Sequence, residues 1–517
     1  MDFSSLPVSA DVVIAGGGIT GAGVLREAIR MGLSAVLIEQ KDYAWGTSSK
    51  SSKLIHGGLR YLKEGKVHLT MDSVIHRERL IREAPGLVSS LGFYMPVYED
   101  KGPGKLMLET GLTVYDLISK KKQHHYLDRD EFTKILPGLD KKGLKGGFYF
   151  HDAQVDDSRL VQRLISESKA LGGYSVNYTR LTDIHRDLKG MVNAVTVQDI
   201  ETGKPHEIKT KAVINATGAW AESIMKSPNP AYHLRPLRGS HLVFPKETFS
   251  FNDAVTLIHP SDKRPLFIIP WESVYIFGTT DIDHKNDLSK EPSMTKQEAV
   301  YLIEALDYYF GSLGKGIKDA ISSFSGIRPV LSRGNVPPSK ESREHAVWEN
   351  KGLVTVTGGK LTTFRKLAWD ALKAAKAYIS INKGINEKQP AFTLNASTRS
   401  DSDLISERAW KRLSGRYGKN AHDIIKGWDG KVTEISGCEI TWAELKFSSA
   451  NEQIRHLSDL LQRRTRLGLL LPNGGSEILD ELGQIVKPVL GWDEHKWNEE
   501  VEIYKKEWQK FHRPPVI

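Results

Sequence analysis

DVVIAGGGITGAGVLREAIRMGLSAVLIE, residues 11–39, is the stretch that decides the fold of this chain. It reads as a short apolar strand, three glycines at G-x-G-x-x-G spacing (Gly16, Gly18 and Gly21), a helix, and a second apolar strand that ends at Glu39. In this pattern the first glycine permits a tight turn, the second lets the backbone approach a pyrophosphate, and the third lets the helix pack closely on the strand. A glycine-rich turn alone is weak evidence, but here the strand, turn, helix, strand and acid follow in the required order.

The start of this helix predicts a dinucleotide site. Backbone N–H groups around Ile19 and Thr20 lack partners at a helix N-terminus, where the helix dipole favours phosphate. Glu39 is placed to accept hydrogen bonds from a ribose diol, and an acid there disfavours a 2′-phosphate. FAD and NAD both satisfy these requirements. The nearness of the motif to the amino terminus favours FAD, because it suggests a fold assembled around a tightly held cofactor.

Composition limits the other classes of function. The 517 residues suffice for two or three domains, and 39% hydrophobic and 26% charged residues are ordinary for a globular protein. One cysteine, Cys438, excludes an internal disulfide and fits a reducing compartment. The amino terminus does not resemble a signal peptide, no apolar run is long enough to span a bilayer, and no residue spacing suggests a metal site.

The net charge of +9 is compatible with nucleic acid, an anionic membrane surface or an anionic substrate. No nucleic-acid motif accompanies the charge, so nucleic acid is not an expected partner. Basic blocks such as residues 120–122 and the pair Arg463-Arg464 are expected to be solvated faces.

The loop after Glu39, QKDYAWGTSSKSSKLIHGGLRYL (40–62), is dense in glycine, serine and threonine. Hydroxyl and backbone N–H groups are what a phosphate and a flavin need for binding. A long polar surface loop is the structural alternative. The cofactor contacts predicted here are Thr47, Ser48, Ser49, Ser52, Lys53, Leu54, His56, Gly57 and Gly58.

The segment TSSKSSKLIHGGLRYL (47–62) strongly resembles the FAD-dependent, membrane-associated glycerol-3-phosphate dehydrogenases. The order of the later motifs resembles this family across residues 10–380, and the carboxy-terminal part resembles it more loosely. The resemblance implies an α/β fold with an FAD-binding Rossmann-type domain, an antiparallel-sheet substrate domain and a helical C-terminal domain.

The expected domain boundaries follow from that resemblance. Residues 1–390 are expected to form the oxidoreductase region, and residues 391–517 the helical domain after a polar linker at 382–402. Within the first region, the FAD-binding domain takes about 1–90, 146–230 and 350–381. The substrate-binding or cap domain takes 91–145 and 231–349, with alternating strand patterns over 232–283 that predict an antiparallel sheet.

Two later stretches are predicted to return to the cofactor. INATGAW (214–220) places small residues after a strand and resembles the second glycine motif of the family. GLVTVTGGKLTTFRK (352–366) repeats strand, glycine pair and helix, which would put N–H groups near the carbonyl edge of a flavin. The contacts predicted from both are Ala216, Thr217, Gly218, Gly359, Lys360, Leu361 and Thr362.

The resemblance also implies a substrate site. The family uses arginines at matching positions around a phosphorylated substrate, and a guanidinium fork binds phosphate oxygens bidentately. These positions are Arg60, with Tyr61 beside it, Arg328 in SSFSGIRPV and Arg343 in SREHAV, of which SREHAV matches the family least closely.

The reaction implied is oxidation of sn-glycerol 3-phosphate at C2 to dihydroxyacetone phosphate, with hydride transfer to the flavin N5. His241 is the leading candidate for the base because imidazole titrates near the working pH, and Arg328 is its rival. Lys360 is expected to stabilise negative charge on the flavin. Electrons are then expected to pass to a membrane quinone.

A quinone-linked chain without a spanning segment is expected to be a cytoplasmic protein on the inner face of the cell membrane. The segment 105–119 supports two interpretations. A stripe of apolar residues at helical spacing usually packs in a core, but with a basic end it can also lie on an anionic bilayer. The stripe consists of Leu106, Leu108, Leu112, Tyr115 and Leu117.

Other functions stay open. A glycerol-3-phosphate oxidase that uses O₂ and produces hydrogen peroxide has the same flavin motifs, although such oxidases tend to carry an extra insertion. Another FAD-dependent amine or hydroxy-acid oxidoreductase is disfavoured by the arginines and by GGLRYL. A flavin-bound sensor without turnover is disfavoured because His241, Lys360 and the three arginines are all present. The sequence does not set the oligomeric state, and a homodimer is possible.

Overall fold

The computed structural model describes residues 3–59, 62, 65, 67–224, 233–332, 345–380, 383–392 and 403–517. The strand–helix–strand unit forms where the glycine motif predicts it, as β1 (Val12–Ala15), α1 (Ile19–Arg30) and β2 (Ala35–Ile38). All four residues of each strand are buried, as their unbroken apolar sequence requires of a parallel strand covered on both faces.

These strands lie at the centre of a six-stranded sheet with the order β18-β19-β11-β1-β2-β7. The other members are β7 (Tyr174–Val176), β11 (Ala212–Asn215), β18 (His345–Asn350) and β19 (Leu353–Gly358). β18 is antiparallel to β19, and the remaining pairs are parallel.

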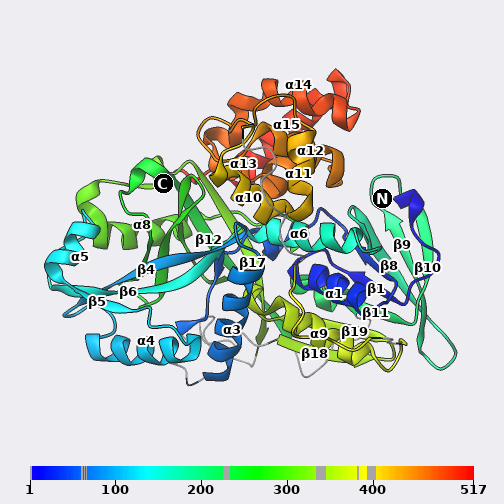
Figure 1. Ribbon diagram of the computed structural model, residues 1–517, viewed down its shortest axis with the longest axis horizontal. Helices are drawn as coiled ribbons and strands as arrows, with labels where there is room; N and C mark the ends of the chain where they lie inside the picture. The colour runs from blue at the N-terminus through cyan, green and yellow to red at the C-terminus, as the bar shows by residue number, and fades with distance from the viewer. Residues whose placement is uncertain are drawn as a thin grey trace.

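Both faces of this sheet are covered (Figure 1). The helices α1, α6 (Asp157–Lys169) and α9 (Phe364–Ala375) pack on one face in a core of aliphatic side chains. A three-stranded antiparallel sheet packs on the other, formed by β8 (Thr179–Arg186), β9 (Val192–Asp199) and β10 (Pro205–Lys209).

A larger mixed sheet forms the second layer of the molecule. Its main strands are antiparallel, as the alternating pattern predicts, but β13 runs parallel to β4. The strands are β3 (Leu54–Ile55), β4 (Val88–Tyr98), β5 (His125–Asp128), β6 (Leu144–Val155), β12 (His233–Pro245), β13 (Ala254–Ile258), β14 (Pro265–Trp271), β15 (Val274–Gly278), β16 (Ile282–Asp283) and β17 (Ser322–Ser332).

Four helices accompany the large sheet. α5 (Arg129–Ile135) and α8 (Lys296–Phe310) pack in one core with it, and each begins at a capping box. α3 (Val67–Glu83) and α4 (Lys105–Ser119) lie beside each other at the opposite edge (Figure 1).

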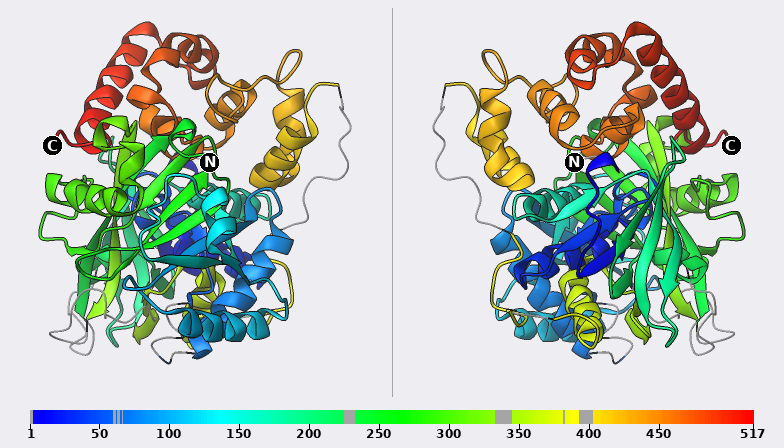
Figure 2. Two further views of the ribbon diagram at one scale, coloured as in Figure 1. Left: turned by 90° about the vertical axis from the view of Figure 1, so that its left-hand side faces the viewer. Right: turned by 90° about the vertical axis from the view of Figure 1, so that its right-hand side faces the viewer.

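The carboxy-terminal part is helical, as predicted, and caps one end of the molecule (Figure 2). Its helices are α10 (Glu407–Tyr417), α11 (Ala421–Lys426), α12 (Trp442–Asn451), α13 (Leu467–Leu470), α14 (Leu479–Leu490) and α15 (Glu494–Phe511), with a π-helical segment at Asp459–Arg464. Within the described residues, no helix has both the length and the apolar content needed to cross a bilayer.

One expected segment differs from the structure. In the predicted linker at 382–402, Phe392 is buried in the core around α1. β10 and β11 follow each other closely in the chain but belong to different sheets, and the hydroxyl of Thr210 between them donates to the carbonyls of Asp11 and Ala212. α12 ends shortly before Gln453, which takes a left-handed conformation with φ of 54°.

Candidate active site

A cavity of about 2800 Å³ lies at the carboxyl ends of the parallel strands. Ala15 at the end of β1, Ile38 at the end of β2 and Gly358 at the end of β19 line it, and residues of the large sheet close it from the other side. Ligands of open α/β sheets bind at this edge. Because pockets for ordinary small ligands measure about 300–1,000 Å³, this cavity has room for a dinucleotide and a second molecule.

The three glycines of the first motif have different surroundings. Gly16 adopts φ of +109°, and a Cβ there would lie 2.6 Å from the carbonyl oxygen of Ala216. A Cβ on Gly21 would lie 1.9 Å from the carbonyl oxygen of Gly16, so this glycine permits the contact of helix and strand. Gly18 instead lines the cavity, and its Cβ would approach only Ser48, at 3.1 Å.

The N-terminus of α1 and Glu39 complete this part of the wall. Gly18 caps the helix without a side-chain hydrogen bond, while the hydroxyl of Ser48 accepts a hydrogen bond from the N–H of Ile19 at 2.9 Å. Glu39 accepts hydrogen bonds from the N–H groups of Gly17 and Lys41, at 2.6 and 2.8 Å. Burial raises the pKa of Glu39, and these two backbone donors oppose the shift.

The later motifs meet the first one at the same cavity. The carbonyl oxygen of Gly218 accepts a hydrogen bond from the hydroxyl of Thr357 at 3.1 Å, which joins the second motif to β19. Lys360 donates to the hydroxyl of Ser73 in α3 at 2.9 Å. The predicted cofactor residues that line the cavity are Gly16, Gly18, Ile19, Thr20, Glu39, Thr47, Ser48, Ser52, Leu54, His56, Gly58, Ala216, Thr217, Gly218, Gly359, Lys360, Leu361 and Thr362.

Four residues predicted at the cofactor site do not line the cavity: Gly21, which packs α1 against β1, and Ser49, Lys53 and Gly57, which lie behind the cavity wall. The ammonium group of Lys53 is fully buried and pairs with Asp157 at 2.9 Å. Burial and the nearby charge of Arg466 lower the pKa of Lys53 to about 7. The N–H of Gly57 donates to the hydroxyl of Tyr115, so these groups support the wall and do not form it.

Arg328 lines the cavity from β17. Its guanidinium contacts the carboxylate of Asp281 at 3.2 Å and the hydroxyl of Thr279 at 3.1 Å. Arg60, Tyr61 and Arg343 lie outside the described residues, so their predicted places at the substrate stay predictions.

His241, the predicted base, lies on β12 and does not itself line the cavity. Its ring stacks on Phe324 with centroids 4.6 Å apart, and Nε2 is 2.8 Å from the hydroxyl of Ser52, which does line the cavity. Burial, followed by the charges of Arg328 and Lys53, holds the pKa of His241 well below its ordinary value. The imidazole is therefore neutral at working pH.

The sequence prediction missed Arg264, a cavity residue that follows a lysine in a turn between strands. Asp281 is fully buried and lies between two guanidinium groups, 3.0 Å from Arg264 and 3.2 Å from Arg328. The hydroxyl of Thr256 also faces this wall and has no protein partner. No local pattern reveals this group, because sheet pairing brings its members together.

The described part of the chain holds no group of three or more histidine, cysteine or acidic side chains suited to a metal ion. Gly16, Gly18, Gly21 (the glycine cradle), Glu39 and the volume of the cavity fit FAD, because Gly18 leaves the N-terminus of α1 open to a pyrophosphate and Glu39 supplies an acid for a ribose.

Comparisons with known proteins agree with this arrangement. Residues 11–365 match the family model of the FAD dependent oxidoreductases, and residues 373–497 match that of the C-terminal domain of alpha-glycerophosphate oxidase. Aerobic glycerol-3-phosphate dehydrogenase of Staphylococcus haemolyticus is 30% identical over 95% of this chain and 92% of its own length. The enzyme of the same name from Staphylococcus aureus is also 30% identical, over 98% of this chain and 96% of its own length.

Solved structures share the fold. A glycerol-3-phosphate dehydrogenase from Bacillus halodurans complexed with FAD is similar with a TM-score of 0.78 and 23% identity, over 97% of this chain and 95% of that one. An L-alpha-glycerophosphate oxidase from Mycoplasma pneumoniae with FAD bound has a TM-score of 0.58 and 18% identity, over 74% and 98%. The chain therefore belongs to the FAD-dependent oxidoreductases and, within them, to the family of the aerobic glycerol-3-phosphate dehydrogenases.

Proposed function

We propose that this protein oxidises sn-glycerol 3-phosphate at C2 to dihydroxyacetone phosphate and passes the electrons to a membrane quinone. The observation that carries the proposal is the pair of guanidinium groups, Arg264 and Arg328, that Asp281 holds in the wall of the cofactor cavity. Both guanidinium groups line the cavity, and a guanidinium fork is the side-chain group best suited to bind phosphate oxygens bidentately. Arg60 and Arg343 are proposed to add to this site.

Residues of the glycine cradle and the loop after Glu39 would hold FAD, which when bound supplies the acceptor for the hydride from C2. The residues that line the cavity would orient the substrate so that C2 faces this acceptor. Lys360, at the N-terminal end of the helix after β19, would place a positive charge beside the flavin ring.

Proton removal from the C2 hydroxyl is proposed to run through Ser52 to His241. The hydroxyl of Ser52 lines the cavity and is within hydrogen-bond distance of Nε2. A neutral imidazole can accept the proton that Ser52 passes on. The rival assignment, Arg328 as base, is disfavoured because its guanidinium is paired with Asp281 and stays protonated.

An apolar end of the cavity supports a quinone as acceptor. Val67 of α3 and Leu106 and Met107 of α4 line the cavity and are also 45%, 81% and 57% exposed. The cavity therefore opens at an apolar surface. A lipid-soluble ring could enter there without crossing a polar surface, whereas a small polar substrate would not need such an entrance.

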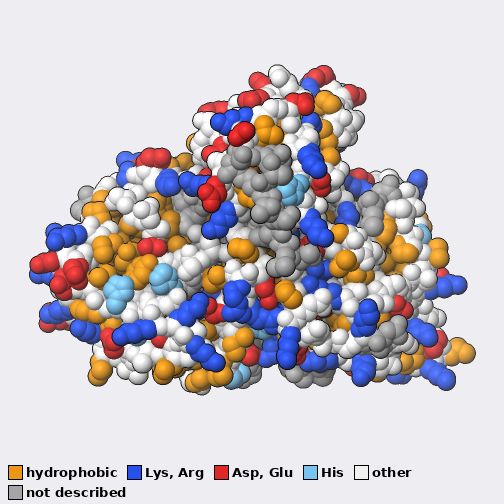
Figure 3. All heavy atoms as spheres, viewed as in Figure 1, with side chains coloured by type: hydrophobic (Ala, Val, Ile, Leu, Met, Phe, Trp, Pro, Cys, Tyr) orange, Lys and Arg blue, Asp and Glu red, His pale blue; other side chains and the backbone are white. Residues whose placement is uncertain are grey.

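The same surface supports attachment to a bilayer. In α4 the predicted stripe divides, because Leu108, Leu112 and Tyr115 are buried whereas Leu106 and Leu117 are exposed. Figure 3 shows hydrophobic and basic side chains together along the lower edge of the molecule, where Figure 1 places α3 and α4. An apolar surface with basic neighbours binds anionic lipid from one side. The protein would thus lie on the inner face of the cell membrane.

A glycerol-3-phosphate oxidase is the second candidate, favoured by the match of residues 373–497 to the C-terminal domain of alpha-glycerophosphate oxidase. Steady-state assays of the purified protein with a soluble quinone, with a dye and with O₂ separate the two. The proposal expects fast reduction of the quinone and the dye and little hydrogen peroxide. Hydrogen peroxide formed at the rate of substrate oxidation would favour the oxidase, and no oxidation with any acceptor would contradict both.

A further inference from the structure

The sequence RRTR (463–466), at the end of the π-helical segment of the C-terminal domain, is buried against the FAD-binding layer. We call its three basic residues, Arg463, Arg464 and Arg466, the arginine segment. Their side chains are 7%, 0% and 2% exposed, which corrects the expectation of a solvated face. Buried arginines require acceptors nearby. Some of these acceptors lie in the C-terminal domain itself, such as Asp459 and the carbonyl oxygens of Glu452 and Gln462, and the others belong to or support the loop after Glu39.

One end of that loop is held at Asp42. The guanidinium of Arg464 binds both carboxylate oxygens of Asp42 at 2.6 and 2.7 Å, and Nε of Arg463 binds it at 2.5 Å. Burial alone would raise the pKa of Asp42, but the two arginines lower it to about 2. Asp42 follows Glu39 closely in the chain, so this contact fixes the loop directly after the proposed ribose-binding acid.

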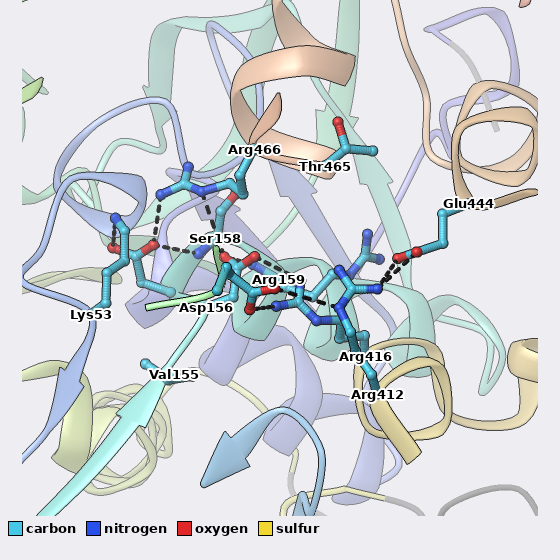
Figure 4. A network of polar contacts seen from close by, with 12 residues as sticks. Lys53, Val155, Asp156, Ser158, Arg159, Arg412, Arg416, Glu444, Thr465 and Arg466 are labelled. Carbon is cyan, nitrogen blue, oxygen red and sulfur yellow. Dashed lines mark hydrogen bonds and ion pairs between the residues drawn. The ribbon is translucent and has the colours of Figure 1, made fainter. Parts of the chain in front are cut away.

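Arg466 holds the middle of the loop (Figure 4). It donates to the backbone carbonyl of Ser49 at 2.6 Å and to one oxygen of Asp157 at 3.0 Å. The other oxygen of Asp157 accepts from the N–H and hydroxyl of Ser51, at 3.0 and 2.7 Å, and from Lys53 at 2.9 Å. Arg466 and Asp157 thus organise the backbone of residues 49–53 from behind.

The segment 49–53 also contributes to the wall of the proposed cofactor cavity. Ser51 and Ser52 line the cavity, and Ser52 is the partner of His241. A loop of this composition would have many conformations if it were not held. The buried ion pairs hold it in one, and removing a single partner leaves a buried charge uncompensated.

Other buried arginines of the C-terminal domain have a different role. Arg416 pairs with Asp156 at 3.0 Å and with Glu272, and Arg412 pairs with Glu444 at 2.8 Å. None of these contacts reaches the cofactor loop. Figure 4 shows Arg416 and Arg466 approaching the start of α6 from opposite sides. Arg466 also lies 3.7 Å from Asp156, so both arginines meet this acid, but among the described contacts it is Arg466 that reaches the cofactor loop, at Ser49.

We infer that the arginine segment is a set of positioning residues through which the C-terminal domain fastens the cofactor loop and sets how tightly FAD is held. The inference rests on the assignment of this cavity to FAD. It makes the helical domain a part of the cofactor site, although none of the described residues of that domain lines the cavity.

Apoprotein of the full chain, titrated with FAD and followed by quenching of flavin fluorescence, tests the inference without turnover. Arg466→Met should raise the Kd for FAD by about 10- to 100-fold, the range expected for losing one buried charged hydrogen-bond group. Arg416→Met is the matched control, because it removes a buried arginine from the neighbouring Asp156. It should lower the melting temperature but change the Kd by less than about twofold.

Arg466→Lys provides the milder variant if Arg466→Met does not fold, since one ammonium group cannot bridge Ser49 and Asp157 as a fork does. It should give an intermediate Kd. Equal Kd values for wild type, Arg466→Lys and Arg416→Met would overturn the inference, as would equal losses in the Arg466 and Arg416 variants. Failure of the wild-type apoprotein to bind FAD would instead contradict the assignment of the cavity.

Discussion

Gly18→Val separates cofactor binding from folding at the first glycine motif. Gly18 has φ of −82°, which any residue adopts. An added Cβ would meet only Ser48, with Oγ at 3.1 Å and Cβ at 3.9 Å. Ser48 needs to move only slightly, so the fold should accept the side chain. The two methyl groups of valine would instead occupy the space over the N-terminus of α1, where a pyrophosphate has to approach the backbone.

The expected loss follows from those contacts. Each backbone N–H that can no longer reach a phosphate oxygen removes a charge-assisted hydrogen bond, which contributes about 1.5–3 kcal/mol. One such loss raises the Kd for FAD roughly 10- to 100-fold, and two multiply the effect. Titration of apoprotein with FAD gives the Kd, and thermal unfolding of the apoprotein gives its stability.

Gly21→Ala provides the opposite case, because its Cβ would lie 1.9 Å from the carbonyl oxygen of Gly16. It should lower the melting temperature of the apoprotein, whereas Gly18→Val should leave it close to wild type. A Gly18→Val apoprotein that melts like wild type and binds FAD with an unchanged Kd would refute this reasoning.

Three further predictions concern the substrate, a buried lysine and the membrane surface. Arg328→Lys should raise the KM for glycerol 3-phosphate and lower kcat/KM by about 10- to 100-fold, because an ammonium group cannot bind Asp281 and a phosphate bidentately; an unchanged kcat/KM would remove Arg328 from the site. Lys53 has a folded pKa of about 7. The unfolded lysine binds its proton up to about pH 10.4, so the unfolded state holds more protons above pH 7 and stability rises with pH. The unfolding free energy of wild type minus that of Lys53→Met, measured by denaturant titration, should increase by about 2 kcal/mol from pH 6 to pH 8.5. A difference that does not change with pH would contradict this prediction. Leu106→Asp should weaken cosedimentation with anionic liposomes, whereas Leu188→Asp, at a fully exposed turn away from α4, should not. Wild-type binding should decrease in high salt without vanishing, and absence of binding at low salt would contradict the membrane surface.

The cofactor-binding half of the fold was predictable from sequence because its signals are local. The glycine spacing, the two apolar runs and Glu39 lie within thirty residues, and each acts through its own strand or turn. The helix at Lys105–Ser119 was predicted with its observed bounds for the same reason. What its stripe could not show is that Leu112 faces the core whereas Leu106 faces outward, because the neighbours of a helix are not encoded in its own period.

The rest of the site depends on contacts between distant segments. Arg264 and Arg328 meet at Asp281 only because β14, β15, β12 and β17 pair in that order. His241 was predicted as the base from the chemistry of its imidazole alone. Its burial could not be predicted in that way, because Phe324 stacks on it only through the register of β12 with β17. Arg464 resembles a surface residue by composition, and its partner Asp42 lies more than four hundred residues earlier.

The central claim is that this cavity oxidises glycerol 3-phosphate at the bound flavin. Anaerobic mixing of the FAD-loaded protein with glycerol 3-phosphate, followed by the visible absorbance of the flavin, tests it most directly. We predict loss of that absorbance within the turnover time, with one dihydroxyacetone phosphate formed per flavin, and no such change with glycerol. Flavin that keeps its absorbance with glycerol 3-phosphate, or that loses it equally with glycerol, would contradict the account.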